Sequence, residues 1–451
     1  MRNTNINSYD KTIETFTKIY RPKSLIGIKK IFRSAKKNKE KICFRGNGQS
    51  YGDQPFITSN ITISNTQLNK ILDLNYKESL VEVQSGIFLK NLSKFLSKYK
   101  YRIKCIPGNE NITIGGAVSN NVHGKDGHKD GFFCDHVEEI KVLEKNCKLA
   151  RYKKNNKNFL YHFNSFGLTG FIYSVKIKIY KINSNCLLIE REMIKNINGL
   201  KKSMLKINKN DFGYAWINGF SKKNIGEGYL EIANYKNHYI QKQNLNSFNS
   251  FFNSLQKIIF IIIKLSNLQR YCFKVIYYLY YQFVKYSKKS FYKTFDEYNF
   301  PHTKITNFYQ NVYPKGFYEI QFFVNLNLAQ KCIKEILLYC QKFKMESLLI
   351  GVKLHNKINS MTCPFSNDSI SIGFDFDKRY FSDFHLKNIS KILKKNDCSI
   401  HLAKDSIFKS SYFGKTQKRN MKILFKYLKS KKTENFFSSD QNLRLNKNKI
   451  F

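Results

Sequence analysis

Alternating apolar and polar residues predict several β-strands along the chain. Within residues 172–180, Val175, Ile177 and Ile179 share one face while lysines occupy the other, as in a half-buried strand. Three further runs have alternating or β-prone compositions, and they are residues 79–84, 316–324 and 369–376.

Apolar residues three and four positions apart predict helices between these strands. Residues 88–99 form one amphipathic pattern, and residues 329–339 also favour a helix. Residues 251–292 are rich in Ile, Tyr and Phe and interrupted by lysines, so they would form helices with a wide apolar face. Two interpretations stay open for this stretch: helices packed in the core, or an interfacial contact with a membrane.

Alternating strands and helices predict a mixed α/β or α+β architecture. A shift in composition near residues 183–185 indicates a domain boundary, and a second region extends from there to about residue 397. The 451 residues allow about two or three domains. Hydrophobic residues make up 42% and aromatic residues 15%, which excludes a disordered chain.

The chain is strongly basic, with 78 Lys and Arg against 32 Asp and Glu and a formal net charge of +46. Clustered basic residues are typical of nucleic-acid-binding proteins because they neutralise phosphates. Here the lysines are spread along the whole chain beside many Asn, Ile, Tyr and Phe residues, so we expect no nucleic acid partner. An anionic membrane surface or a phosphate-bearing substrate explains the charge better.

The ten cysteines include no CxxC pair, so a zinc ribbon, a thioredoxin motif and a disulfide framework all lack support. His123 and His128 have no completing carboxylates or thiolates, and we expect no metal. No signal peptide is evident, and the apolar run Ile258–Ile263 is far shorter than the roughly 20 residues of a spanning helix. Free thiols fit a reducing compartment. We therefore expect a cytoplasmic protein, either soluble or peripheral at the inner face of the membrane.

Two glycine-rich segments are the strongest candidates for chemistry. Residues 45–53, RGNGQSYGD, predict a loop whose backbone N–H groups can approach a phosphate closely. This segment is neither a P-loop, because no Gly-Lys-Ser/Thr follows, nor a Rossmann fingerprint, because its glycine spacing differs. Residues 107–124, PGNENITIGGAVSNNVHG, pair Gly115 with Gly116 and leave room for a flat or phosphorylated ligand against the main chain.

Together the two segments resemble the loops RGxGxSYGD and PGxxxxTxGGAxxxxxHG of the vanillyl-alcohol-oxidase class of FAD-binding oxidoreductases, which have a PCMH-type FAD-binding domain. In that class both loops surround the pyrophosphate and flavin of FAD. Many members attach FAD through a histidine of a GRGHS pattern in the first loop. Gln49 stands at that position here, so the resemblance implies non-covalent FAD.

Further motifs resemble the decaprenylphosphoryl-β-D-ribose 2′-oxidases of this class, in order and over nearly the whole chain. They are HGKDGH at 123–128, FGLTG at 166–170, YAWI at 214–217, GFYEIQF at 316–322, LAKDS at 402–406 and FSSD at 437–440. The chain departs from the pattern at two places. Ser371 and Gly373 replace an Asn and a flavin-proximal Cys, and Glu319 replaces one of two paired glutamines, although Gln321 is retained.

The resemblance implies an α+β fold. A PCMH-type FAD-binding domain with two subdomains would occupy residues 1–182. A substrate or cap domain with a mainly antiparallel sheet would occupy residues 183–398. Residues 399–451 would pack back on the FAD domain and return to the flavin.

The resemblance also implies the site residues. The implied catalytic residues are Lys404, Tyr51 and His123, and the implied substrate-binding residues are Lys125, Glu319, Gln321, Lys353 and Lys404. The implied cofactor-binding residues come from the two loops and two outlying positions: Arg45, Gly46, Asn47, Gly48, Gln49, Ser50, Tyr51, Gly52, Asp53, Gly108, Thr113, Ile114, Gly115, Gly116, Asn120, Val122, His123, Ile172 and His401. The alternatives to these catalytic roles are that Lys404 is an ordinary solvated lysine, that Tyr51 only packs in the fold, and that His123 is a hydrogen-bonded core histidine.

The resemblance implies hydride transfer to flavin N5 from a sugar hydroxyl, with a cation beside the flavin to stabilise its reduced form. The implied substrate is the 2′-hydroxyl of a polyprenylphosphoryl pentose, a cell-wall polysaccharide precursor. This oxidation would be the first half of an epimerisation that an NADH-dependent reductase partner completes. An aldonolactone or alditol oxidase for a soluble sugar is the alternative enzyme. A flavin-free module that holds nucleic acid with its positive charge is the alternative of a different class.

Overall fold

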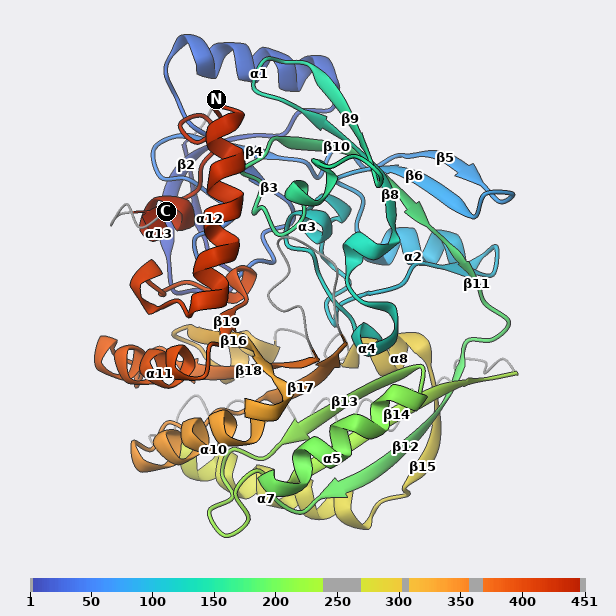
Figure 1. Cartoon of the computed structure of the whole chain (residues 1–451), viewed down its shortest axis with the longest axis vertical. Coiled ribbons are helices and arrows are strands. Elements are labelled where there is room, and N and C mark those ends of the chain that lie inside the picture. Colours follow the sequence, from blue (N-terminus) through green and yellow to red (C-terminus); the bar gives the residue numbers. More distant parts are fainter. Residues whose placement is uncertain (1–2, 238–268, 302–307, 357–367, 447–451) are drawn as a thin grey trace.

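The computed structural model of the chain describes residues 3–237, 269–301, 308–356 and 368–446. Within these residues the strands form sheets of four, five, two and eight strands, with helices packed against them (Figure 1). The predicted α+β class with antiparallel sheets is confirmed. No helix in these described ranges is both long and apolar enough to cross a membrane.

The N-terminal sheet has the order β1-β2-β4-β3, with β4 parallel to both β2 and β3. Its strands are β1 (Asn3–Asn7), β2 (Glu14–Tyr20), β3 (Ile42–Arg45) and β4 (Ile61–Ser64). Helix α1 (Leu25–Lys37) begins where the Ser24 hydroxyl accepts the Gly27 N–H, and it buries Ile28 and Phe32 against the sheet.

The second sheet is antiparallel, with the order β5-β6-β10-β8-β9. The strands are β5 (Ile71–Asn75), β6 (Leu80–Gln84), β8 (Val137–Leu143), β9 (Leu149–Lys153) and β10 (Phe171–Lys178). Helices α2 (Leu89–Ser97) and α3 (Ile114–Ser119) share its core. The predicted strands at 79–84 and 172–180 and the predicted helix at 88–99 are confirmed. A short pair, β7 (Tyr101–Arg102) and β11 (Tyr180–Lys181), leads to the next sheet.

The third large sheet is antiparallel and has the order β15-β12-β14-β13-β17-β18-β16-β19. The strands are β12 (Cys186–Ile194), β13 (Phe212–Ile217), β14 (Gly228–Lys236), β15 (Ser290–Thr294), β16 (Phe317–Asn325), β17 (Ile350–His355), β18 (Ser369–Asp377) and β19 (Ser399–Ile400). One face packs against α5 (Leu200–Leu205), α10 (Leu326–Lys342) and α11 (Asp383–Lys395). The predicted strands at 316–324 and 369–376 and the predicted helix at 329–339 are confirmed.

The opposite face of the eight-stranded sheet is polar and aromatic. Because side chains alternate along a strand, Glu319 and Gln321 of β16 point away from the apolar core that holds Ile320 and Phe322. Two helices lie on this second face: α7 (Gln269–Tyr286), which packs against Trp216, and α8 (Phe295–Asn299). The short helix α4 (Gly127–Asp130) abuts β17 there, and α9 (Phe308–Val312) precedes β16. This face therefore meets the first part of the chain and carries the polar side chains.

The prediction of helices for residues 251–292 is only partly confirmed. Residues 251–268 lie outside the described residues, and α7 confirms a helix over much of the remainder. The prediction is wrong for residues 290–292, which belong to β15. Strand β12 offers an unpaired edge to this segment, so that Phe291 pairs with Ile189 and Ser290 with Glu190. The backbone hydrogen bonds that this segment gains by pairing with β12 outweigh the helical preference of its local sequence pattern.

The C-terminal helices α12 (Lys415–Ser430) and α13 (Asp440–Asn446), drawn in red in Figure 1, lie beside the N-terminal strands drawn in blue. The Ile42 N–H donates to the Phe436 carbonyl at 2.8 Å, and the Ser438 N–H donates to the Ile42 carbonyl at 2.9 Å. The preceding strand β19 pairs with β16. The division of the chain at residues 182 and 398 stays a prediction.

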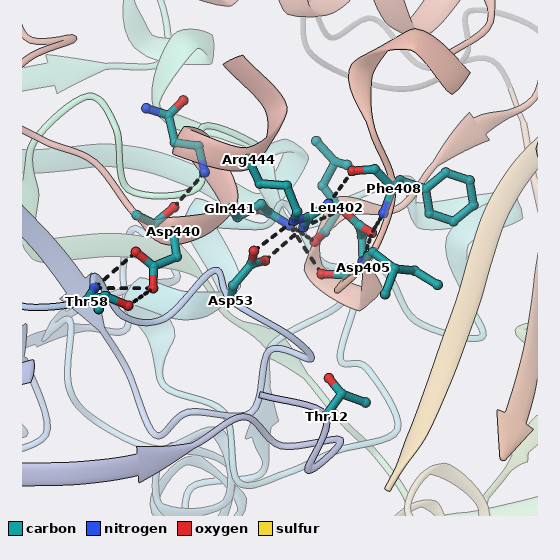
Figure 2. A network of polar contacts seen from close by, with 12 residues as sticks. Thr12, Asp53, Thr58, Leu402, Asp405, Phe408, Asp440, Gln441 and Arg444 are labelled. Atoms are coloured by element: carbon teal, nitrogen blue, oxygen red, sulfur yellow. Dashed lines mark hydrogen bonds and ion pairs between the residues drawn. The ribbon is translucent and has the colours of Figure 1, made fainter. Parts of the chain in front are cut away.

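Arg444 of α13 joins three distant segments (Figure 2). Its Nε and Nη2 donate to the two carboxylate oxygens of Asp53, both at 2.8 Å, and Nη2 also donates to Asp405 at 3.0 Å. Although burial opposes it, the carboxylates of Asp405 and Asp53 raise the pKa of Arg444. Gln441 adds a 2.7 Å hydrogen bond to the Leu402 carbonyl.

Replacing Arg444 by methionine is expected to lower the free energy of unfolding by about 3 kcal/mol, because two buried carboxylates lose their cation. Thermal unfolding of both proteins measures this loss. The control is Arg379→Met, since Arg379 is 35% exposed and its pair with Asp377 should contribute less than about 1 kcal/mol. Equal effects of the two substitutions would contradict the central role of Arg444.

Candidate functional site

The first glycine-rich segment is a loop that leaves the end of β3. Among the described residues, the backbone N–H groups from Gly46 to Ser50 donate to no protein acceptor. The next N–H, that of Tyr51, is bonded to the Ala403 carbonyl at 2.9 Å. Consecutive free N–H groups on a loop form a cavity that suits an anion.

Two glycines of this loop are required by close approach. Gly48 has φ of +66°, and a Cβ there would lie 2.1 Å from the Arg45 guanidinium, which folds beneath the loop. Gly52 has φ of +65°, and a Cβ there would lie 2.5 Å from Ser406. Burial lowers the pKa of Arg45. Arg45 therefore supports the loop from inside the fold.

The second glycine-rich segment, residues 107–124, contains the whole of α3. The Thr113 hydroxyl accepts the Gly116 N–H at 3.2 Å and caps this helix. Gly46 of the first loop lies directly against that hydroxyl, because a Cβ at Gly46 would be 2.5 Å from Thr113 Oγ1. A Cβ at Gly116 would meet only the same oxygen, at 3.3 Å, so one side of Gly116 is open.

Side-chain amides tie the two loops together. Asn47 Nδ2 donates to the Asn111 carbonyl at 2.9 Å, and Asn109 Nδ2 donates to Gln49 Oε1 at 2.8 Å. Deeper in the fold, Gln54 Nε2 donates to Asn120 Oδ1 at 2.7 Å. The structure thus brings together the predicted cofactor residues of both segments in one cradle.

A hollow lies between the end of α3 and the C-terminal segment. It is lined by Asn120 and His401, both predicted to bind the cofactor, and by Phe132 and Phe323. The side chains of Ile114 and Ile172 are buried in the core of the second sheet and Val122 packs against this core, so these three side chains do not line the hollow. Gly108 is open, with only the Asn299 carbonyl 3.6 Å from a Cβ built there.

Lys404, Tyr51 and Glu319 meet where β16 faces the first loop. The Lys404 ammonium lies 3.3 Å from Glu319 Oε2 and 3.6 Å from the centre of the Tyr51 ring. Tyr51 is 3% exposed and stacks on Tyr9 with 4.8 Å between ring centres. Burial, followed by the charge of Glu319, raises the pKa of Tyr51 well above its usual value. A cation and a carboxylate are therefore held side by side next to a neutral phenol.

Asp375 stands opposite Glu319 in the β16–β18 pair, a position that the sequence analysis did not assign. One of its oxygens, Oδ2, is buried without a hydrogen-bond partner among the described residues. Burial and the charge of Glu319 raise the pKa of Asp375 well above its usual value. Since two close carboxylates resist joint ionisation, burial and the neighbouring Glu319 both favour the protonated form of Asp375.

Gly351 and Gly373 are paired in the centre of the same face. Nothing lies within 4 Å of a Cβ built at Gly351, and at Gly373 the nearest atom is Glu319 Oε1 at 3.1 Å. The sheet therefore has a notch beside the Lys404–Glu319 pair.

Three buried histidines continue this face. The rings of His123 and His355 are 4.6 Å apart, and those of His123 and His401 are 5.8 Å apart. His355 Nε2 bonds to the Ser371 hydroxyl at 2.8 Å. Burial lowers the pKa of His123 and His355 well below the usual value and that of His401 to about 3. The sequence analysis missed His355, although its alternation with Lys353 on β17 is the signal that could have found it.

The two remaining predicted lysines lie in different surroundings. Burial, and then the charge of Lys404, lowers the pKa of Lys353 to about 8. Lys125 donates to the Tyr298 carbonyl at 2.5 Å and lies 4.0 Å and 4.3 Å from the ring centres of Tyr298 and Tyr214. Burial lowers the pKa of Lys125 to about 7, although Glu231 opposes the shift. Lys125 is thus enclosed by aromatic rings, whereas Lys353 faces Lys404.

Comparison with known proteins decides what the cradle holds. Residues 17–152, which contain both loops, match the profile of an FAD binding domain. Residues 17–152 therefore form an FAD-binding domain.

Several proteins similar to part of this chain are named for their reactions. A decaprenylphosphoryl-beta-D-ribose oxidase of Mycolicibacterium smegmatis is 28% identical over 34% of this chain and 34% of its own. A putative D-arabinono-1,4-lactone oxidase of Neurospora crassa is 27% identical over 37% of this chain and 30% of its own. An L-gulonolactone oxidase of Mus musculus is 23% identical over 28% of each. The matches span about a third of the relatives' length.

The residues present fit FAD. The unpaired N–H groups of the first loop and the open side of Gly116 can receive the pyrophosphate. The predicted FAD-binding capacity is confirmed, whereas the roles of single site residues stay predictions. No group of three or more His, Cys, Asp or Glu side chains in the described ranges could hold a metal ion.

We predict that Gly116→Leu prevents FAD uptake, because the new side chain would extend into the open side of the cradle. The loss of affinity should be at least about tenfold, or 1.4 kcal/mol. Visible absorbance of the purified protein and FAD titration measure it. Gly199→Leu is the matched control, since nothing lies within 4 Å of its Cβ position either. Unchanged FAD binding by Gly116→Leu would contradict the assignment of the two glycine-rich loops as the FAD-binding site.

The buried histidines predict acid sensitivity. Since the folded state lowers the pKa of His123, His355 and His401, the unfolded chain binds more protons below about pH 6.5. The free energy of unfolding should therefore fall as pH drops from about 6.5 towards 3, by up to about 1.4 kcal/mol per pH unit for each histidine. His355→Phe should lessen this slope, measured by urea unfolding between pH 5 and 7. An identical slope in both proteins would contradict the prediction.

Proposed function

We propose that this chain oxidises a sugar hydroxyl, with FAD held in the cradle without a covalent bond. The observation that carries the proposal is the Lys404–Glu319 pair, which stands on the polar face of the eight-stranded sheet directly beside Tyr51 of the first loop. The sugar-related names of three relatives support the substrate class. Gln49, at the position that carries a histidine in covalent members, supports non-covalent binding.

The residues have separate tasks in this proposal. Bound FAD supplies a hydride acceptor. The Glu319 carboxylate accepts a hydrogen bond from the sugar hydroxyl and takes its proton, and Lys404 stabilises the negative charge that develops on the oxygen. Asp375 stays protonated beside Glu319, so that the pair carries one negative charge. Gln321 orients the sugar, and Lys353 is placed to meet a phosphate.

The finer proposal is the 2′-hydroxyl of a polyprenylphosphoryl pentose, as the first half of an epimerisation that an NADH-dependent reductase completes. The motifs shared with the decaprenylphosphoryl-ribose oxidases along the chain support it, as does the cation Lys353 near Lys404. The second candidate is an aldonolactone or alditol oxidase for a soluble sugar. Glu319, which replaces a glutamine of the first pattern, and the two relatives named as lactone oxidases favour this candidate.

Anaerobic mixing of the FAD-loaded protein with each sugar class tests the proposal. The visible flavin absorbance should be lost with the true substrate class and should persist with the other. Lys404→Met should slow this loss about 100-fold, because a preorganised charge at the reacting oxygen is removed. Lys409→Met, which changes an exposed lysine on the same segment, is the control. Retention of the flavin spectrum with polyprenylphosphoryl pentoses, aldonolactones and alditols alike would overturn the proposed function.

A further inference from the structure

Helix α7 exposes a continuous apolar stripe. Its residues have large solvent-exposed fractions, which are 61% for Tyr271, 57% for Val275, 61% for Tyr278, 59% for Leu279, 68% for Phe283 and 78% for Tyr286. They recur three and four positions apart, so they lie along one side of the helix. The other exposed large hydrophobic residues of the described chain include Tyr280, whose ring lies against Trp216, and are otherwise spread over many elements from β2 to α13. Single exposed apolar residues are ordinary, but a continuous apolar surface marks an interaction site.

The fold does not use this stripe to hold α7 in place. The opposite side of the helix buries Phe273 and Val284, which are 7% and 3% exposed. On that side Tyr277 stacks on Trp216 and donates a hydrogen bond to the Leu348 carbonyl. The α7 stripe is therefore available to something outside the described fold.

The charges around the α7 stripe indicate which kind of surface binds to it. Between Lys236 and Phe295 the sequence contains no Asp or Glu. Exposed lysines border the stripe along α7 and just beyond its end, and they are Lys274, Lys285, Lys288 and Lys289. An apolar and aromatic face with lysines at its edge suits the boundary between lipid headgroups and acyl chains. The lysines add attraction for anionic lipids.

The buried side of α7 leads to the candidate active site. Phe273 belongs to the same buried aromatic cluster as Tyr51 and Phe317. The ring of Tyr51 in turn carries Lys404 on its face. A surface that binds the α7 stripe would therefore lie one helix thickness from the site.

We infer that α7 is an interfacial helix that docks the enzyme on an anionic bilayer, with the active site next to the membrane. The inference deepens the proposed function, since a lipid-linked sugar would then reach Lys404 and Glu319 without leaving the bilayer. It rests on that function only for the direction of substrate entry. The docking itself depends on the stripe and its lysines.

Sedimentation of the FAD-loaded full chain with vesicles tests the docking. Vesicles of phosphatidylcholine mixed with phosphatidylglycerol should bind the protein at least tenfold more tightly than phosphatidylcholine alone. The double variant Tyr278→Glu, Phe283→Glu should lose at least tenfold in affinity for the mixed vesicles. The matched control is Tyr380→Glu, Phe384→Glu, whose residues are 58% and 56% exposed on another part of the surface. The control should change affinity less than twofold.

A charge variant separates the two contributions. Lys285→Gln, Lys288→Gln, Lys289→Gln should weaken binding to the mixed vesicles at least tenfold. Its binding to phosphatidylcholine alone should stay the same. Equal binding to both vesicle types by the unaltered protein would overturn the inference.

Other occupants of the stripe give different results, and each would overturn the inference. If a second copy covers the stripe, Tyr278→Glu, Phe283→Glu converts a dimer to a monomer while vesicle binding is absent. If another segment of the chain covers it, the same variant lowers the thermal unfolding midpoint below that of the control. Flavin reduction by a soluble sugar analogue is measured in parallel. Flavin reduction without vesicle binding refutes the docking alone, whereas vesicle binding without flavin reduction by any sugar refutes the proposed function alone.

Discussion

The pairing of Arg444 with Asp53 and Asp405 is the contact on which the site depends. It fixes the end of the first glycine-rich loop to the segment that carries Lys404, although the three residues are far apart in sequence. In the same region the Tyr51 N–H donates to the Ala403 carbonyl, which adds a backbone contact next to Lys404. The cradle and Lys404 thus keep their relative position through a buried charge network rather than through a continuous sheet.

Because side chains alternate along each strand, one face of the eight-stranded sheet packs in the apolar core and the other carries the polar residues of the candidate site. Ile320 and Phe322 belong to the apolar core on one face, while Glu319 and Gln321 alternate with them along β16 and lie on the opposite face. The site is therefore built on rigid strands, and substitutions on the polar face can change chemistry without disturbing the core. Burial of this face lowers the pKa of the histidines and raises the pKa of Asp375.

Sequence patterns predicted the parts of the fold that depend on local periodicity. The strands β6 and β10 and the helices α2 and α10 follow directly from apolar spacing, and the cradle follows from glycines that permit close approach. Residues 290–292 were assigned wrongly because pairing with β12 overrides their local pattern. Asp375 could not be assigned because its partner Glu319 lies on another strand, and the alternation that places His355 beside Lys353 does not reveal its contact with His123. Only strand register and tertiary contact bring such groups together.

The notch at Gly351 and Gly373 has a consequence for how closely a bound ring could approach this face. The gap exists only because both positions lack a side chain, and nothing lies within 4 Å of a Cβ built at Gly351. A single substitution at either glycine would therefore fill part of the gap, as the cysteine does that stands at the position of Gly373 in the oxidases the chain resembles. The depth of this face is thus set by two residues on neighbouring strands, while Glu319 stands at its edge.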